Sequence, residues 1–390
     1  MHRISVAERR ARLAVRHHLT PREPAATVLQ AARDMVCLHA SDPSSVYISV
    51  RARMANGTIE AVDRALFEER TLVRMLAMRR TMFVIPVDEA ATIHAAASLA
   101  VARTERRRTE QLVASLGVAD VARWMRDAER AALAALEKRG EATARQLAED
   151  VPMLREQTVI SAGKTYEGKL GMSGRILLQL AVDGRMVRGR PRGSWLSRQY
   201  AWSTIEHWLG RPWEPIPVDE ARAAVVRRWL ERFGPGTEAD IRWWTGWSAG
   251  VVRRALGAIE AVEVDLDGAT GHVLADDLAA TRSPGPWAAL LPSLDPTTMG
   301  WRDRDWYLGR HRPLLFDLNG NAGPTIWVDG RIVGGWAVRS GGEVATRLLE
   351  DVGRAAERTV AAEATRLSEW FDSVQPVPTF PAPLYRELVG

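Results

Sequence analysis

Apolar residues recur at helical spacing through the first two thirds of the chain, and short extended segments come in pairs between the helices. The helices that this spacing predicts cover residues 4–19, 25–36, 59–66, 118–139, 170–182, 221–233 and 251–259, with another beginning at Pro43. Extended segments at 72–76 and 81–85 meet at Met78-Arg79-Arg80, and a second hairpin joins 262–265 to 271–274. Helices followed by a hairpin are typical of a winged-helix module.

One short pattern occurs twice and indicates an internal repeat. It is Gly-x-x-Thr with an apolar residue four positions after the threonine, found at Gly140, Thr143 and Leu147 and again at Gly234, Thr237 and Ile241. Each copy follows one amphipathic helix and precedes another helix, so the repeat predicts tandem winged helices rather than an α/β enzyme. The sequence has no Gly-rich phosphate loop, alternating βαβ pattern or nucleophile elbow.

The last third of the chain changes to short strands and tight turns. Segments at 288–296, 313–316, 325–328 and 331–336 predict a small barrel or sheet, followed by a helix over 342–371 and an irregular tail at 376–383. The predicted fold is α+β and mainly helical, with tandem winged-helix motifs and a small C-terminal β-barrel. The predicted regions are three winged-helix regions at 1–115, 116–215 and 216–285, and a barrel with the C-terminal helix and tail at 286–390.

Composition and charge limit the kinds of function that the protein can have. The 390 residues are 46% hydrophobic and carry a formal charge of +5, almost all of it from arginine, which favours an anionic partner such as nucleic acid. The single cysteine, Cys37, excludes a disulfide framework and a cysteine-based zinc site and indicates a reducing compartment. The chain shows no signal-peptide core and no uncharged run long enough for a membrane span. We therefore expect a cytoplasmic protein with no membrane contact, no metal and no cofactor.

Candidate chemistry begins with two polar residues, His39 and Ser41, in an apolar run just before Asp42-Pro43. Asp42 is expected to be the N-cap of a helix, and Pro43 its first residue. In an extended segment His39 and Ser41 share one side of the backbone. They would lie ahead of a helix N-terminus, where negative charge or phosphate is favoured. The alternative at this stage is a structural histidine and a turn serine.

Basic residues gather at both of the first two predicted wings. The first turn carries Arg79 and Arg80, and the second wing carries Arg185, Arg188, Arg190 and Arg192 ahead of Trp195. Arginines in such positions are candidates for contacts with backbone phosphates. The alternative is that they only solubilise exposed loops. The third hairpin, at 262–274, is acidic, so the repeats are not expected to serve the same electrostatic purpose.

Over nearly its full length the chain resembles the AlkZ-like DNA glycosylases. The resemblance rests on the residues up to Asp42-Pro43, on Met78-Arg79-Arg80-Thr81, on Gly236-Thr237 with Asp240 and Trp244, on the run from Leu291 to Arg304, and on Val328 to Trp336. It implies tandem winged helices and a C-terminal β-barrel, wrapped into a C-shape with a basic concave face. It also adds Thr81 to the candidate DNA contacts.

The resemblance places the catalytic motif at His39-Ala40-Ser41, and here the chain departs from the family. The family carries Gln, an apolar residue and then Gln or Asp directly before Asp-Pro, so both polar positions differ. The family also tends to carry a histidine where this chain has Phe83. A branch with histidine at the first position is similar to the enzymes that antibiotic producers use against their own intercalating, guanine-alkylating products, of the trioxacarcin type.

Such a slight motif suits the chemistry that the resemblance implies. N7-alkylated guanine is cationic and already a good leaving group, so a positioned water and stabilisation of an oxocarbenium-like sugar are what remain to be supplied. His39, with a pKa expected near neutrality, would orient or deprotonate the water. Ser41 would hold that water or contact the flanking phosphate, and Asp42 would add negative charge if the N-cap does not use it wholly.

The expected enzyme is a monofunctional glycosylase that leaves an abasic site in double-stranded DNA. No lysine lies near the motif in the sequence to form a Schiff base. A bulky adduct is not easily flipped into a tight pocket, so an open groove is expected, in a protein acting as a monomer. Two alternatives remain: a winged-helix transcription regulator without catalysis, and a protein that sequesters lesions after losing activity.

Overall fold

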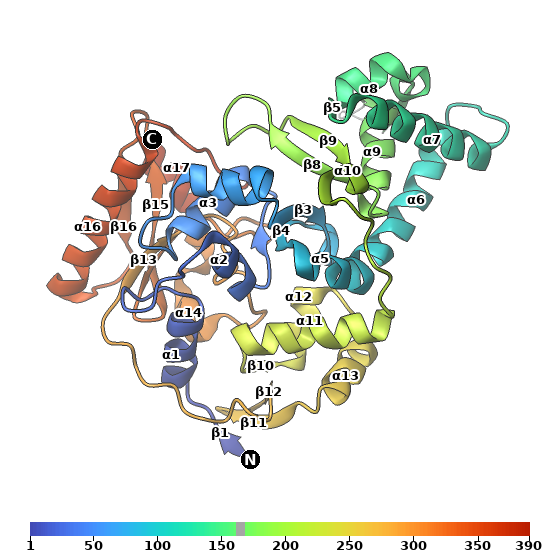
Figure 1. Ribbon diagram of the computed structural model, residues 1–390. Helices are drawn as coiled ribbons and strands as arrows, with labels where there is room; N and C mark the ends of the chain where they lie inside the picture. The colour runs from blue at the N-terminus through green and yellow to red at the C-terminus, as the bar shows by residue number, and fades with distance from the viewer. Residues whose placement is uncertain (161–167) are drawn as a thin grey trace.

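Three successive units with the same order of elements make up the first 273 residues of the computed structural model, which describes residues 1–160 and 168–390 (Figure 1). The first unit contains α1 (Val6–Arg16), α2 (Val28–Asp34), β2 (Leu38–His39), α3 (Pro43–Arg51), α4 (Ile59–Asp63), the π-turn η1 (Arg64–Glu68), β3 (Leu72–Leu76), the 3₁₀ turn η2 (Met78–Arg80) and β4 (Met82–Pro86). Segments α5 (Val87–Ile93), η3 (His94–Ser98) and α6 (Leu99–Ala114) then lead to the second unit.

The second unit repeats this order with a hairpin inserted between its helices. It contains α7 (Val121–Arg139), β5 (Ala142–Thr143), α8 (Ala144–Asp150), η4 (Pro152–Arg155), the inserted strands β6 (Gln157–Ile160) and β7 (Gly168–Gly171), then α9 (Met172–Val182), β8 (Met186–Pro191), β9 (Tyr200–Thr204) and α10 (Ile205–Leu209). The third unit contains α11 (Val218–Phe233), β10 (Gly236–Thr237), α12 (Glu238–Thr245), α13 (Ala249–Ala258), β11 (Val262–Leu266) and β12 (Ala269–Val273).

The sheets of the three units have the same topology. In each, the two-residue strand pairs antiparallel with the second strand of the hairpin, giving the orders β2-β4-β3, β5-β9-β8 and β10-β12-β11. In the third unit β1 (His2–Arg3) adds a parallel edge next to β11. The repeat predicted from the sequence therefore corresponds to a real structural repeat.

A helix cap explains why the repeated sequence pattern marks this fold. Thr143 and Thr237 each end a two-residue strand and cap the helix that follows, with reciprocal bonds to Gln146 and Asp240. Such a capping box satisfies backbone N–H groups that would otherwise lack partners at the start of the helix. In the first unit Asp42 is the cap instead, so Ala40 and Ser41 stand between the strand and the cap.

The C-terminal region is a four-stranded antiparallel sheet with helices around it. Its elements are β13 (Ala288–Leu291), α14 (Asp305–Leu308), η5 (Gly309–His311), α15 (Arg312–Leu315), β14 (Thr325–Val328), β15 (Arg331–Val338), β16 (Val344–Leu348), α16 (Gly353–Phe371) and α17 (Pro383–Val389). The strand order is β13-β14-β15-β16. Helix α16 packs against β13 and β16, and α17 packs against β15.

Three predictions for this region need correction. Within the described part of the chain β13 and β16 do not pair, so the sheet is open and the predicted closed barrel is wrong. Residues 312–315 form the helix α15 rather than a strand, and residues 344–348 form β16 rather than the start of a helix. A short apolar run is compatible with either a strand or a buried helix. The segments packed against residues 312–315 and 344–348 therefore determine which of the two forms. The mixed helical and sheet content does confirm the α+β class.

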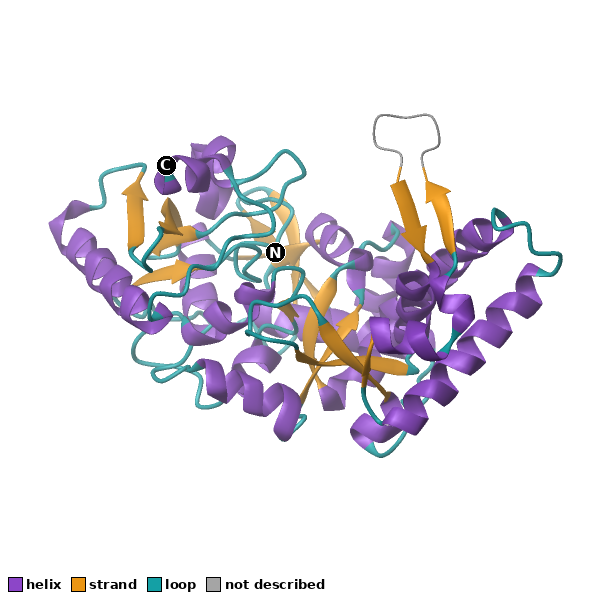
Figure 2. Ribbon diagram, turned by 90° about the horizontal axis from the view of Figure 1, so that it is seen from above, coloured by secondary structure: helices purple, strands orange, loops and turns teal. Residues whose placement is uncertain are grey.

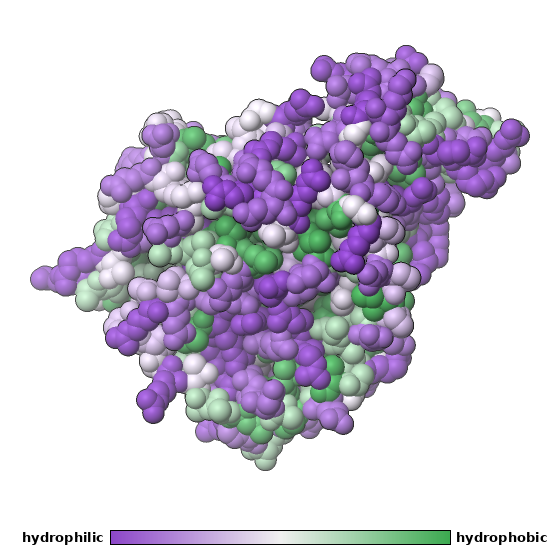
Figure 3. Space-filling view, viewed as in Figure 1, coloured by the Kyte–Doolittle hydropathy of each residue, from purple (hydrophilic) through white to green (hydrophobic). Residues whose placement is uncertain are grey.

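Two large hydrophobic cores, with two smaller clusters beside them, hold the described part of the molecule together. The largest core runs continuously from the first unit through the third unit to the C-terminal sheet, with Trp229 and Trp327 in it, and it also includes Val187, Ile205 and Trp208 of the second unit. The second unit encloses its own core around Leu136 and Ile176. Figure 2 shows an elongated molecule, with the C-terminal region at one end and the strands β6 and β7 projecting sideways from the opposite half. On the face in Figure 3, hydrophilic side chains predominate and hydrophobic ones form small scattered groups.

No helix among the described residues is long and apolar enough to span a bilayer.

Candidate active site

The residues of the predicted motif lie where the first unit passes from β2 into α3. His39 ends β2 and pairs with Phe83 of β4, and the next N–H, of Ala40, donates to the carbonyl oxygen of Met82 at 2.9 Å. Ser41 follows in a bend, half-buried, and its side chain makes no hydrogen bond to the described residues. The chain reaches the helix one residue later, so the motif occupies the junction of strand and helix.

Asp42 is the N-cap of α3, and both of its carboxylate oxygens are taken up by protein groups. Oδ1 accepts bonds from the backbone N–H of Ser44 at 3.1 Å and from the Ser44 hydroxyl at 2.8 Å. Oδ2 accepts from the backbone N–H of Thr379 at 3.0 Å. The side chain is almost fully buried. Asp42 therefore serves as the helix cap, and its burial keeps both oxygens in contact with protein groups.

His39 is half-buried and packs against Phe83, with ring centroids 4.8 Å apart. Its Nδ1 is buried and lacks a hydrogen-bond partner among the described residues. Burial, together with the charges of Arg79 and Arg304, lowers the pKa of His39 to about 4, against a smaller opposing effect of Asp295. The imidazole is therefore neutral at physiological pH, which corrects the expected near-neutral pKa. A neutral ring can accept a proton or a hydrogen bond.

The helix that follows the motif is anchored through one polar face. Ser45, Ser49 and Arg53 are spaced by four residues and so lie on one side of the helical turn. The hydroxyl of Ser45 donates to the carbonyl oxygen of Ser293 at 2.6 Å, and that of Ser49 donates to Asp295 at 2.7 Å. Arg53 forms a bidentate pair with the carboxylate of Asp295 at 2.9 and 2.8 Å, with both side chains fully buried. The loop from the C-terminal region therefore supports α3 along its length.

A tryptophan from the third unit reaches the same site. The guanidinium of Arg79 lies 4.4 Å from the centroid of the Trp243 ring, and that of Arg304 lies 4.5 Å from it. Gly246 ends α12 with a positive φ of 75°, and a Cβ there would stand 3.0 Å from Cγ of Arg79. The close approach of Arg79 to α12 therefore needs glycine. Arg79 itself is exposed, so its charge is held in place beside His39 and remains accessible.

The other two candidates in the first hairpin have partners inside the protein. Arg80 binds the buried carboxylate of Glu105 through two nitrogens at 2.7 and 3.1 Å, although about half of its own side chain is exposed. Thr81 closes the turn through its backbone, with its N–H bonded to Met78 and its carbonyl oxygen to Ala77. Arg79 is therefore the more available cation of this turn.

The arginines of the second wing fall into two groups. Arg190 pairs with Asp63 at 3.2 Å and Glu68 at 3.1 Å, and half-buried Arg188 lies over Tyr200 and Trp202, with 5.6 and 5.2 Å to the ring centroids. Arg185 and Arg192 are exposed, and neither has a carboxylate partner within the described residues. The available cations of the wing are therefore at its two ends.

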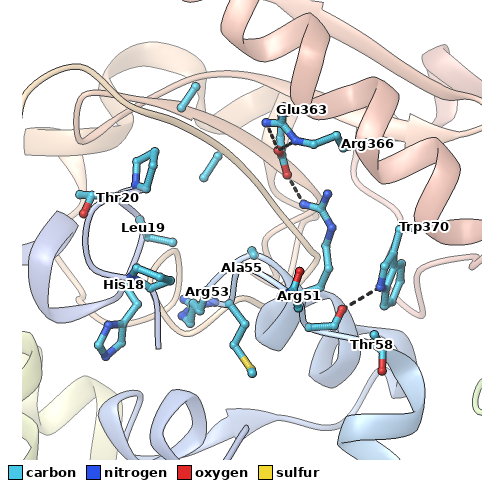
Figure 4. Close-up of a pocket in the computed structure, with 18 of the residues that line it drawn as sticks. His18, Leu19, Thr20, Arg51, Arg53, Ala55, Thr58, Glu363, Arg366 and Trp370 are labelled. Carbon is cyan, nitrogen blue, oxygen red and sulfur yellow. Dashed lines mark hydrogen bonds and ion pairs between the residues drawn. The ribbon is translucent and has the colours of Figure 1, made fainter. Parts of the chain in front are cut away.

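Two cavities near α3 differ in size and position. A cavity of about 660 Å³ lies at the C-terminal end of α3, between the loop with His18 and Thr20 and the helix α16 (Figure 4). Since α3 has nine residues, about 13 Å separates its two ends. The cavity beside Asp42 is only about 10 Å³, room for roughly one water molecule. A base could not be accommodated there.

Four residues at or beside this site were not singled out as functional from the sequence. Asp295 and Arg304 lie within the run from Leu291 to Arg304, which was one basis of the family resemblance. That run was therefore the sequence signal that could have indicated them. Trp243 is one residue before the recognised Trp244, and its role depends on where the third unit packs. Thr379 contacts Asp42 from 337 positions away in the chain, and nothing in the sequence indicates that contact.

Comparison with known proteins shows the class to which the chain belongs, a family of DNA-repair enzymes. A model of the AlkZ-like DNA glycosylase family matches residues 32–370, and the chain belongs to that family. The matched range includes the motif, the loop with Asp295 and most of the C-terminal region. The family resemblance inferred from the sequence is thereby confirmed.

A curated relative and a solved structure, both from Streptomyces sahachiroi, are similar to the chain. The relative, named an interstrand DNA cross-link repair glycosylase, is 30% identical over 176 residues, which are 42% of this chain and 46% of the relative. The chain thus aligns with just under half of that relative's length. The solved structure, a DNA glycosylase AlkZ, is 24% identical with a TM-score of 0.71, covering 96% of this chain and 99% of its own. That likeness shows a shared fold.

Proposed function

We propose that the protein is a monofunctional DNA glycosylase that hydrolyses the N-glycosidic bond of N7-alkylated guanine in duplex DNA. The observation that carries this proposal is the state of His39. It is neutral, half-buried and without a partner for Nδ1, at the strand–helix junction where the family places its catalytic motif. A polar atom left without a partner beside two cations is typical of a functional site rather than of a structural core.

In the proposed reaction the N9–C1′ bond breaks and its electron pair neutralises the cationic base. Water adds its oxygen to C1′ of the oxocarbenium-like sugar, and the proton that it loses passes to His39 or to solvent. His39 orients this water as a hydrogen-bond acceptor, and Ser41 provides a second contact to the water or to the flanking phosphate. Asp42 acts as a positioning residue, because both of its oxygens are bound by protein groups. The product is an abasic site in an unbroken strand.

The three repeated units are best interpreted as winged helices that bind the duplex, in a C-shaped monomer with a basic concave face. Arg79, Arg185 and Arg192 are the proposed phosphate contacts, because they are exposed and carry no carboxylate partner in the described chain. We expect smaller contributions to DNA binding from the other candidates, because they are also engaged in contacts within the protein. These are Arg80, Thr81, Arg188 and Arg190. We retain the four predicted regions, 1–115, 116–215, 216–285 and 286–390, as the division of the chain.

We expect a bulky adduct to be preferred over a small one. The cavity of about 10 Å³ beside Asp42 includes neither His39 nor Ser41 in its lining, so it offers no pocket for an extruded base at the motif. An enzyme that leaves its lesion in the groove is not limited by adduct size. The relative's name refers to cross-links, which are also too large to extrude. We propose a role in self-resistance to an antibiotic that alkylates guanine.

The experiment uses two duplexes, one with N7-methylguanine and one with a bulky, intercalated guanine-N7 adduct. Each is incubated with wild-type protein or His39→Ala, and alkali then cuts abasic sites. We expect strand breaks with the wild type, more with the bulky adduct, and a loss of about 100-fold or more in the variant. Absence of breaks together with tight binding to one undamaged sequence would instead establish a regulator. Tight binding to damaged DNA without breaks would establish a sequestering protein.

A further inference from the structure

We propose that the loop at residues 192–199 and the segment at residues 373–382 form a clasp that positions the catalytic motif through Asp42. We call the loop between β8 and β9 the wing loop, and the segment between α16 and α17 the C-terminal segment. The inference rests on the proposed function, because the motif that the clasp holds is the proposed active site. Figure 1 shows the wing loop reaching from the second unit toward α3 and α17.

The first contact of the clasp joins the wing loop to the C-terminal segment. The guanidinium Nη2 of Arg198 donates to the hydroxyl oxygen of Thr379 at 2.5 Å. Arg198 is exposed and has no carboxylate partner among the described residues, so this hydroxyl is the contact that holds its side chain. Thr379 lies between the buried Pro378 and half-buried Phe380, in a segment whose backbone proline keeps stiff.

The second contact joins the C-terminal segment to the motif. The backbone N–H of Thr379 is the partner of Asp42 Oδ2, while Oδ1 caps α3 through Ser44. Thr379 therefore contacts Arg198 with its side chain and Asp42 with its backbone. Since Asp42 is buried, a carboxylate oxygen that lost the Thr379 N–H would be left without a partner and would move.

The third contact fixes the wing loop on α3 itself. The ring of Trp195 lies 5.0 Å from that of Tyr47 on α3 and 5.9 Å, edge-on, from that of Trp370 on α16. Tyr47 is fully buried and donates its hydroxyl to Asp63. The loop therefore contacts α3 directly through Trp195, and contacts the cap of α3 through Arg198 and Thr379.

The geometry assigns Arg198, Thr379 and Trp195 to positioning roles. None of them lies in the motif. They act on the residue that starts α3, and His39 and Ser41 stand three and one positions before that residue. A displacement of about 1 Å at a catalytic group can cost up to about 100-fold in rate. Loss of the clasp should therefore reduce the excision rate more than it reduces DNA binding.

The test separates the two contacts of Thr379. Thr379→Ala removes the hydroxyl and keeps the N–H, Thr379→Ser keeps both, and Thr379→Pro removes the N–H. Single-turnover excision of the bulky guanine-N7 adduct and the Kd for the same duplex are measured for each. We expect a loss of about 10- to 100-fold in rate for Thr379→Pro, a smaller loss for Thr379→Ala, near wild-type rate for Thr379→Ser, and little change in Kd. Thr365→Ala is the matched control, because that hydroxyl bonds only within α16.

Arg198 supplies a second and milder route to the same conclusion. Arg198→Ala should reduce the rate as much as Thr379→Ala does, and the double variant should be no slower than either one, because both remove one contact. Arg358→Ala, an exposed arginine on α16, controls for the loss of a charge. Equal losses from Arg198→Ala and Arg358→Ala would overturn the proposal, and so would fully additive effects of the Arg198 and Thr379 changes.

Hydrogen exchange tests whether the clasp holds the start of α3, even if no excision activity is found. In Thr379→Pro and Arg198→Ala the amides at the start of α3, from Ser44 to Val46, should exchange faster, while those of α7 keep their wild-type protection. Unchanged exchange at the start of α3 would overturn the clasp whatever the activity. Faster exchange with a wild type inactive on both adducts would leave the clasp intact and refute the proposed function.

Discussion

At the scale of single residues, the protonation of His39 is the property that most directly governs the proposed chemistry. Its pKa of about 4 lies well below the ordinary value of 6.5, chiefly because the ring is buried and next because Arg79 is near. The neutral imidazole is therefore present throughout the physiological range. An active-site group whose pKa is displaced in this way leaves a signature in the pH dependence of the rate.

We predict that the single-turnover excision rate is constant between about pH 6 and pH 8 and falls only as the pH approaches 4, where His39 takes up a proton. The rate is measured across this range and corrected for depurination without enzyme. His39→Gln, which restores the family residue, should keep part of the activity and lose the acid limb. A rate that already halves near pH 6.5 would show that His39 has an ordinary pKa in the DNA complex.

The same pKa has a consequence for stability, with a definite sign. The folded state holds His39 with a pKa below that of the unfolded chain, so the unfolded chain takes up the proton first as the pH falls. His39 therefore lowers the free energy of unfolding progressively from about pH 6.5 down to about pH 4. Chemical denaturation at pH 7 and pH 5 should show a smaller loss at pH 5 in His39→Gln than in the wild type. An equal loss in both would contradict the assignment.

Among the structural elements, the first hairpin combines an unfavourable backbone with an accessible charge. Arg79 and Arg80 both have positive φ, 54° and 59°, in the left-handed region that residues with a Cβ rarely adopt. Such strain is retained where the side chains serve a purpose. Arg80 binds the buried Glu105, whereas among the described residues the side chain of Arg79 stacks on Trp243 and has no carboxylate partner, which leaves its charge for the proposed contact with DNA.

This arrangement predicts opposite effects of one change on stability and on binding. Arg79→Gly and Arg79→Ala both remove the charge and the stacking on Trp243, so each should weaken duplex binding to the same extent. Only glycine relieves the positive φ, so Arg79→Gly should be more stable than Arg79→Ala by about 0.5–1 kcal/mol. Urea denaturation measures the difference in free energy of unfolding. Equal stability of the two variants would show that the turn relaxes without strain.

The second wing allows its available and occupied arginines to be compared. Arg192 is exposed without a carboxylate partner in the described chain, whereas Arg190 is held by Asp63 and Glu68. Each phosphate contact contributes about one unit to the slope of log K against log salt. Arg192→Ala should therefore lower that slope by about one, and Arg190→Ala by clearly less. A larger change for Arg190 would mean that it leaves its carboxylates when DNA binds.

Elements specified by local chemistry were predictable from the sequence, and elements specified by neighbours were not. The two Gly-x-x-Thr copies identify capped helices because the cap and the helix are adjacent in the chain, and Asp42-Pro43 identified α3 in the same way. In contrast, α15 and β16 were predicted wrongly, because short apolar runs take the form that their neighbours impose. The pKa of His39 and the partner of Asp42 depend on Arg304 and Thr379, which only the fold brings near.

For the whole molecule, the central question is which parts unfold together. The first unit, the third unit and the C-terminal sheet share one hydrophobic core, which also includes Val187, Ile205 and Trp208 of the second unit, while α7, α8 and α9 enclose a second core. The fully buried pair of Arg53 and Asp295 joins α3 to the C-terminal region inside the shared core. Asp295 also accepts bonds from the Ser49 hydroxyl and the Thr297 N–H. Removing this carboxylate therefore affects several buried donors at once.

We predict that Asp295→Ala destabilises the shared core by about 3–5 kcal/mol, because it leaves the buried charge of Arg53 without its partner. The separate core of α7, α8 and α9 should stay largely intact. Hydrogen exchange should show lost protection in α3 and β15 but not in α7, since separate cores open separately. Asp276→Ala, at an exposed position, is the control and should change stability by less than about 0.5 kcal/mol. The double variant Arg53→Met with Asp295→Leu removes both charges and should recover much of the loss. Parallel loss of protection in α3 and α7 would show instead that the two cores unfold as one unit.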